Sequence, residues 1–190
     1  MGIEPGKVID VAWIVFSLIW LIAAFTTKRT VRRQTTGSLA IQVCLLAVAI
    51  NLLGRKRLAI GALAWRLLPD TAAIEWIGAA LTLAGLAFAV RARFYLGRNW
   101  SSSVTVKQGH QLIRSGPYAM VRHPIYSGMT LAVLGAAIAI GQVKGLAGLL
   151  IVVLAWKQKS LIEERFMIEQ FGDEYERYRR EVKWLIPYVW

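Results

Sequence analysis

The stretch from Ala72 to Val90, AAIEWIGAALTLAGLAFAV, decides the class of this chain. Its only charged residue is Glu75, near one end. A helix rises about 1.5 Å per residue, so the stretch is long enough to cross a hydrocarbon core of about 30 Å. Gly78 and Gly85 lie a heptad apart on one face, where small residues let a second helix approach closely. We therefore predict a membrane helix that packs against a neighbour.

Four other apolar runs flank this stretch: Val8–Phe25, Ser38–Leu53, Ser127–Ile140 and Leu146–Trp156. The last two are short for a crossing, and the GQVKG between them predicts a tight helical hairpin. Beyond Trp156 the pattern continues without a helix breaker to Phe171, so we expect one long helix that leaves the membrane. The segment from Arg55 to Asp70, which Gly, Arg and Pro interrupt, is expected to lie along the interface.

Composition agrees with a membrane protein. Of 190 residues, 56% are hydrophobic, which exceeds what an ordinary soluble domain carries. A net charge of +12 suggests contact with anionic headgroups, and no nucleic-acid motif accompanies it. The single cysteine, Cys44, excludes an intramolecular disulfide and a metal site of several thiolates, and no metal is expected. We predict a single domain, residues 1–190, that is all-α and polytopic, with about five transmembrane helices.

The distribution of basic residues predicts the orientation of these helices. With five crossings, six basic residues fall on one side: Lys7, Arg55, Lys56, Arg57, Arg66 and Lys144. The other 17 of the 23 Lys and Arg fall on the opposite side, together with the loop that precedes Ser127 and the tail. We therefore expect that loop and the tail to face the cytoplasm. The first apolar run lacks a small-residue cleavage site and is expected to be a retained helix.

The loop itself, Lys107–Gly128, has the sequence KQGHQLIRSGPYAMVRHPIYSG and holds both histidines of the chain. Gly116-Pro117 predicts a turn, and Pro124 suits the first turn of a helix. Side chains on both sides of these breaks can therefore converge on one small volume. The alternative is that its aromatic and basic residues are interfacial anchors at headgroup level.

Three segments, LGRNWS, GHQLIRSGPYAMVRHPIYSG and EERFMIEQFGDEYERY, resemble the integral-membrane methyltransferases typified by isoprenylcysteine carboxyl methyltransferase. The wider group includes phospholipid N-methyltransferases. The resemblance covers about Phe94 to Pro187 and implies transmembrane helices in residues 1–93 and a catalytic region in 94–190. It also implies S-adenosylmethionine as methyl donor and a lipid-like acceptor, the α-carboxylate of a prenylated cysteine. No GxGxxG follows a strand pattern, so a Rossmann-type methyltransferase is excluded.

By resemblance, the cofactor residues come from the loop and from the last long helix: His110, Gln111, Leu112, Ile113, Tyr118, His123, Pro124, Ile125, Tyr126, Glu163 and Glu164. His123 and Tyr126, three residues apart, share a face if this turn is helical. Of the two carboxylates we favour Glu163 as the partner of the cofactor ammonium, because a charge-assisted hydrogen bond is roughly twice as strong as a neutral one. The alternative is an ordinary helical ion pair between Lys159 and Glu163.

The residues expected at the acceptor depart from the family pattern. Lys159 stands where the carboxyl-methylating relatives carry an arginine, so the charge is kept and the planar fork is lost. Glu181 stands where relatives have a basic residue, a place that Arg180 or Lys183 could fill. Trp100 is a candidate wall of an acceptor tunnel, with an interfacial anchor as the equal alternative.

Different acceptors require different chemistry. A carboxylate is already nucleophilic and needs no base, whereas an amine or thiol must lose a proton, for which His123 is the candidate. The alternatives to carboxyl methylation are N-methylation of an aminophospholipid, a non-catalytic membrane scaffold, and a reductase that uses a nicotinamide cofactor.

Overall fold

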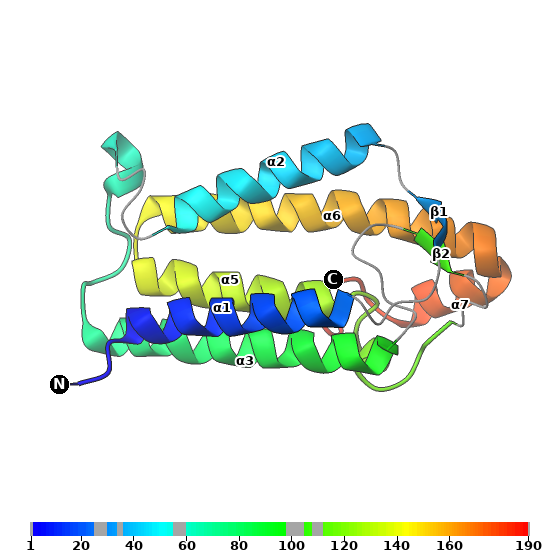
Figure 1. The fold of residues 1–190 in the computed structure, drawn as a ribbon, viewed down its shortest axis with the longest axis horizontal. Coiled ribbons are helices and arrows are strands. Elements are labelled where there is room, and N and C mark those ends of the chain that lie inside the picture. The colour runs from blue at the N-terminus through cyan, green and yellow to red at the C-terminus, as the bar shows by residue number, and fades with distance from the viewer. Residues whose placement is uncertain are drawn as a thin grey trace.

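The computed structural model describes residues 2–24, 30–33, 36–54, 60–97, 105–107 and 112–189. The described chain is almost entirely helical (Figure 1). Its elements are α1 (Pro5–Ala24), β1 (Thr30–Arg33), α2 (Thr36–Leu53), the 3-10 helix η1 (Gly61–Ala64), α3 (Ala72–Leu96), β2 (Thr105–Lys107), α4 (Pro117–Met120), α5 (Pro124–Ile140), α6 (Val143–Phe171) and α7 (Asp173–Glu181).

Four of these helices, α1, α2, α3 and α6, are long and apolar enough to cross a membrane, and α5 is a shorter apolar helix. The prediction of an all-α integral membrane protein with about five crossing helices is therefore confirmed. The last apolar run extends in both directions into α6, one continuous helix from Val143 to Phe171, as expected. The sequence pattern did not predict β1 and β2, which pair antiparallel with Thr30 opposite Lys107.

The helices form two layers, with α2 and α6 on one side and α1, α3 and α5 on the other (Figure 1). The tightest contact is between α3 and α5, where a Cβ added at Gly78 or at Gly85 would lie 2.5 Å from a backbone oxygen of α5. Thr82, fully buried between these two glycines, donates to the carbonyl oxygen of Ala132 at 3.1 Å. The prediction that the glycine face of α3 packs closely against a neighbour is confirmed, and that neighbour is α5.

A hairpin joins α5 to α6 at one end of the bundle. Gly141 ends α5 in the left-handed conformation, with φ +64, which a glycine adopts without steric cost. The predicted tight hairpin is thereby confirmed. Residues 65–68 pack on this hairpin through backbone hydrogen bonds, including Leu67 N to Gly141 O at 2.7 Å.

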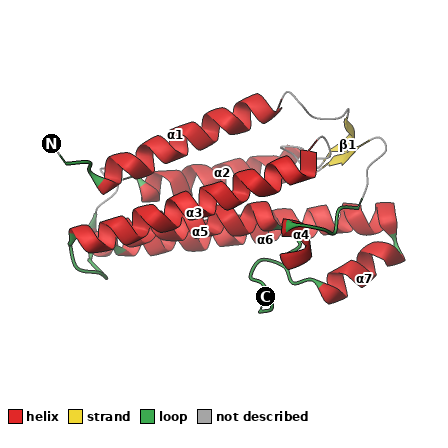
Figure 2. Cartoon of the chain, turned by 90° about the horizontal axis from the view of Figure 1, so that it is seen from below, coloured by secondary structure: helices red, strands yellow, loops and turns green. Residues whose placement is uncertain are grey.

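The opposite end of the bundle carries the remaining elements. Arg93 of α3 is buried and donates to the carbonyl oxygen of Ala23 at 2.6 Å, which ties the end of α1 to α3. At this end α6 continues beyond the other long helices, and α7 folds back beneath it (Figures 1 and 2). We call this the site end, because α7 and the start of α5 lie beside α6 here and α4 packs on α3 and α5.

Candidate active site

The site begins where the loop enters α5. Gly116, at φ +59, precedes the single helical turn α4, and the backbone is extended at Val121 before Pro124 starts α5. Because Pro124 opens the helix, His123 and Tyr126 lie on one side of its first turn. Their rings stack in parallel, with centroids 5.4 Å apart and an angle of 8°. Tyr126 stacks in turn on Trp156 of α6, with centroids 4.9 Å apart.

The long helix α6 brings two carboxylates to these rings. Tyr126 donates its hydroxyl proton to Glu163 Oε1 at 2.5 Å. The other oxygen of Glu163 lies 3.4 Å from His123 Nδ1, and Glu164 Oε1 lies 3.1 Å from His123 Nε2. The imidazole is therefore held between two adjacent carboxylates. We call His123, Tyr126, Glu163 and Glu164 the polar cluster.

The charge state of the polar cluster follows from these contacts. Burial alone would lower the pKa of His123, but the hydrogen bonds and negative charges of Glu163 and Glu164 outweigh it, so this pKa is raised above its ordinary value. The ring is buried, at 8% exposure. As an imidazolium it donates from both nitrogens, one to each carboxylate.

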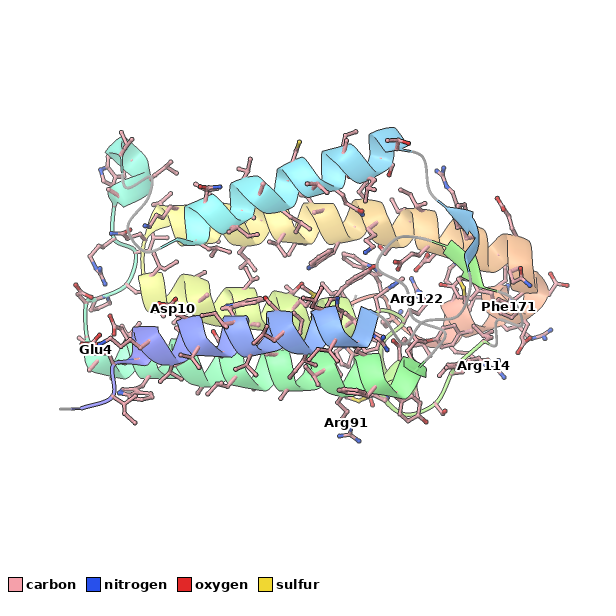
Figure 3. All side chains as sticks on the ribbon, viewed as in Figure 1. Glu4, Asp10, Arg91, Arg114, Arg122 and Phe171 are labelled. Carbon is pink, nitrogen blue, oxygen red and sulfur yellow. The ribbon has the colours of Figure 1, made fainter. Side chains whose placement is uncertain are left out.

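Arg122 connects the polar cluster to the tail of the chain. Its Nε donates to Glu164 Oε1 at 2.9 Å, and its Nη1 donates to the carbonyl oxygens of Val182 and Arg179 at 2.5 and 3.1 Å. Arg122 lies between α6 and α7 in Figure 3. Sequence reasoning treated this residue only as a candidate interfacial anchor. Its position immediately before His123, within R-H-P, was the available signal.

Residues 182–185, which we call the strap, run beside the loop that precedes α5. Val121 and Lys183 form a parallel bridge. The amide of Arg122 donates to Lys183 O at 2.8 Å, and the amide of His123 donates to Trp184 O at 3.2 Å. Ser127 Oγ donates to Leu185 O at 2.5 Å. The strap thus fixes the backbone of Arg122 and His123, two of the residues whose side chains engage the carboxylates.

Helix α7 supports the loop from the other side. Tyr178, buried against it, donates its hydroxyl proton to the carbonyl oxygen of Tyr118 at 2.6 Å. Burial raises the pKa of Tyr178 above its usual range, so the hydroxyl stays a neutral donor. Tyr118 itself is buried in α4.

The predicted site residues fall into three groups. Those that the structure brings together are His123, Pro124, Ile125, Tyr126, Glu163 and Glu164, with Lys159 Nζ 5.6 Å from the centre of the Tyr126 ring. Leu112 and Ile113 are half-buried at the start of the described loop, while the side chains of Arg180, Glu181 and Lys183 are exposed. Trp100, His110 and Gln111 lie outside the described residues.

Comparison with curated proteins finds relatives with one shared name. Protein-S-isoprenylcysteine O-methyltransferase of Schizosaccharomyces pombe is 36% identical over 98 residues, which cover 49% of this chain and 41% of that protein. The protein of the same name from Homo sapiens is 28% identical over 127 residues, or 64% of this chain and 45% of that protein. The chain spans about half the length of these two relatives.

Comparison with solved structures finds the eukaryotic intramembrane Ras methyltransferase ICMT, with a TM-score of 0.57 and 22% identity. The match covers 82% of this chain and 54% of that one, and it shows a common fold. Residues 73–174 match the model of the phospholipid methyltransferase family. This match includes α3, α4, α5 and α6 and takes in more than half of the chain. The chain therefore belongs to the phospholipid methyltransferase family.

Proposed function

We propose that the protein is a membrane methyltransferase that uses S-adenosylmethionine to methylate a lipid-like acceptor, the α-carboxylate of a prenylated cysteine. The observation that carries this proposal is the polar cluster, which joins a carboxylate pair on α6 to the first turn of α5 at the end of an apolar bundle. The names of the curated relatives support the choice of reaction.

The donor set fits the amino-acid part of the cofactor. The side chain of Glu163 is 26% exposed and that of Glu164 is 9% exposed, so Glu163 is the more accessible carboxylate. Glu163 would accept a hydrogen bond from the cofactor ammonium, while Tyr126 and His123 hold the carboxylate in place. By resemblance, Leu112, Ile113 and Tyr118, with His110 and Gln111, would line the nucleotide. When bound, the cofactor supplies an electrophilic methyl group.

The chain's own residues also bear on the acceptor. Lys159 lies one helical turn before Glu163 on α6 and close to the Tyr126 ring, so its positive charge is next to the polar cluster. A cation there would bind one oxygen of an acceptor carboxylate and leave the other oxygen free to attack. The protein's contribution to the reaction is then alignment in a site poor in water.

The state of His123 favours a carboxylate over an amine. Each ring nitrogen already faces a carboxylate oxygen, and the two carboxylates raise the pKa of His123, which favours the protonated ring. An imidazolium has no lone pair with which to take a proton from an amine or thiol. A carboxylate acceptor needs no such base. N-methylation of an aminophospholipid remains the second candidate because the matching family model is that of phospholipid methyltransferases.

Two measurements test the function directly. Calorimetry in detergent is expected to show saturable binding of S-adenosylmethionine and none of NADPH. Label from the methyl group is then expected to pass to an N-acetylated S-prenylcysteine and not to phosphatidylethanolamine. Binding of NADPH alone would reject the methyltransferase proposal, and transfer to the phospholipid would select the second candidate. We further propose that the site end faces the cytoplasm, which protease access in oriented vesicles checks.

Glu163→Gln tests the proposed cofactor contact. The substitution keeps the size of the side chain and removes the charge that would face the ammonium, which is expected to weaken cofactor binding at least about tenfold. Calorimetry measures this dissociation constant. The matched control is Glu169→Gln, an exposed glutamate on the same helix, which is expected to bind cofactor normally. Equal affinity in the two variants would remove Glu163 from the cofactor site.

Lys159→Ala tests the acceptor contact. We expect the KM for the prenylcysteine acceptor to rise by about tenfold or more while the cofactor dissociation constant changes little, since a charge-assisted contact to the acceptor is lost. Lys157→Ala serves as the control, because it removes a lysine of the same helix whose Nζ lies over the Trp184 ring, 4.4 Å from its centre. A Lys159 variant that changes both constants equally would contradict an acceptor role.

A further inference from the structure

A strained turn follows the strap. The amide of Val189 donates to the carbonyl oxygen of Ile186 at 3.2 Å, which closes a four-residue turn with Pro187 in its second position. Tyr188, in the third position, has φ +65, and it is the one non-glycine residue with positive φ in the part of the chain that the structure describes. Proline followed by positive φ is typical of a type II turn, whose third position is usually glycine. A tyrosine there costs on the order of 1 kcal/mol of backbone strain.

This strained turn holds its apolar side chains outward. Tyr188 is 91% exposed, Val189 is 73% exposed and Ile186 is 47% exposed. Tyr188 and Val189 are largely uncovered by the rest of the described chain, and exposed apolar groups of this kind mark contact surfaces. The turn therefore combines a strained backbone with exposed apolar side chains. We call the side chains of Ile186, Tyr188 and Val189 the hydrophobic tip.

The strap fixes where this tip lies. Leu185, the residue before the turn, accepts a hydrogen bond from Ser127 in the first turn of α5. The apolar body of α5 begins at that point, so the turn sits at the level where a membrane helix would meet the headgroups. Figures 1 and 2 both show the tail returning from α7 toward the body of the bundle. Aromatic residues are enriched at this level of membrane proteins.

Charge on the same segment indicates which surface the tip meets. Arg180, at the end of α7, and Lys183, in the strap, both have exposed side chains. Exposed basic residues beside an apolar tip complement a layer of anionic headgroups, and the chain as a whole carries a charge of +12. A contact with another protein copy would not by itself require the two basic side chains.

We propose that the turn Ile186–Val189 is an anchor that inserts into the headgroup boundary of an anionic bilayer and thereby seats the strap. The inference depends on the helices crossing a membrane and not on the reaction catalysed. Because the strap binds the backbone of Arg122 and His123, insertion of the turn would also hold the loop that carries the polar cluster. The lipid partner is an anionic phospholipid surface.

The single cysteine of the chain makes the test direct. In a Cys44→Ser background, a spin label is placed at Val189→Cys, and a control label at Asp173→Cys. Asp173 is exposed and lies beside Phe171, at the far end of α6 (Figure 3). The protein is reconstituted in phosphatidylcholine bilayers with and without phosphatidylglycerol. For each label, accessibility to oxygen is divided by accessibility to a water-soluble nickel complex. This ratio is expected to be several-fold higher at position 189 than at position 173.

Two further variants assign the contributions. Phosphatidylglycerol is expected to raise this ratio at position 189, by about fivefold in the insertion equilibrium for each basic side chain. Removing the charges with Arg180→Gln and Lys183→Gln is expected to abolish that gain. Tyr188→Gly relieves the backbone strain and removes the ring, so the label at 189 is expected to become accessible to nickel while the melting temperature in detergent does not fall. Nickel accessibility at 189 equal to that at 173 in all lipids would overturn the proposal. Dipolar broadening between two labels at 189 would overturn it in favour of a contact between two copies.

Discussion

The α3–α5 contact and the polar cluster are two ways of joining helices in the same molecule. Between α3 and α5 the fit is steric, since Gly78 and Gly85 of α3 let backbone meet backbone with Thr82 buried between them. At the site end the fit is electrostatic, since Arg122, His123 and Tyr126 pair with the two carboxylates of α6. The α3–α5 contact leaves no room for an added atom. In the polar cluster, a carboxylate can exchange one hydrogen-bond donor for another.

This difference separates the scaffold from the site. A contact made of backbone and small side chains gives a single distance between α3 and α5, and α5 carries His123 and Tyr126 at its first turn. A contact made of charges needs that fixed frame, because buried charges are stabilising only when their partners stay in place. The steric contact therefore sets the position at which the polar cluster can form.

Gly85→Val is expected to have the largest effect, because it acts on the steric contact between α3 and α5. A Cβ at this position would lie 2.5 Å from the backbone oxygen of Gly128, and backbone atoms cannot move aside as a flexible side chain can. We expect a loss of at least about 3 kcal/mol of stability and little folded protein. Thermal unfolding in detergent and the yield of monodisperse protein measure this.

The matched control for that substitution is Gly37→Val in α2. A Cβ at Gly37 meets nothing within 4 Å, so the same chemical change falls on a membrane helix with open space beside it. We expect near wild-type stability. Similar losses at both glycines would mean that helix propensity, and not the close approach of α3 to α5, decides the effect.

Arg122→Gln tests the electrostatic contact at the site end. The substitution removes the cation from Glu164, but the imidazolium of His123 still faces the same oxygen, so we expect a loss of about 1 to 3 kcal/mol and not a failure to fold. The bonds to Val182 and Arg179 are lost as well, so the strap is expected to open more often. Hydrogen exchange at the Arg122 amide position and at His123 should then rise relative to α3.

Arg122→Lys separates charge from geometry in this prediction. Lysine keeps the cation near Glu164 but cannot reach the carboxylate and two carbonyl oxygens at once as the planar guanidinium does. We expect stability between that of the wild type and that of Arg122→Gln, with strap exchange close to the glutamine variant. If the lysine variant restored slow exchange, charge alone would hold the strap.

Sequence predicted the scaffold better than the site. The apolar runs and the glycine spacing on α3 predicted the helices and the close approach, because both depend on local composition and on a periodicity that any one helix displays. The resemblance also placed His123, Tyr126 and the α6 carboxylates in one predicted site, but it did not predict the direct hydrogen bonds between them. The roles of these residues remain predictions.

What sequence did not predict depends on backbone pairing and on long-range partners. The strap makes its bonds largely through main-chain atoms of Lys183 and Trp184, and these leave no side-chain pattern. Arg122 resembles an interfacial arginine until α7 and the strap bring carbonyl oxygens to it. The positive φ of Tyr188 occurs at the third position of a type II turn, where glycine is usual. In each case the determining partner is more than fifty residues away or is a backbone torsion.

The smallest expected effect concerns the protonation of His123. Its pKa is raised in the folded protein because, despite burial, Glu163 and Glu164 stabilise the imidazolium. The stabilisation is therefore fully present below the unfolded pKa of about 6.5 and is lost as pH rises through the higher folded value. Melting temperature in detergent should fall slightly as pH rises from about 6.5 through the higher folded pKa. His123→Asn, which cannot titrate, should flatten this slope and leave the steric contact at Gly85 unchanged, so a slope of equal size in the variant would place the titration on another group.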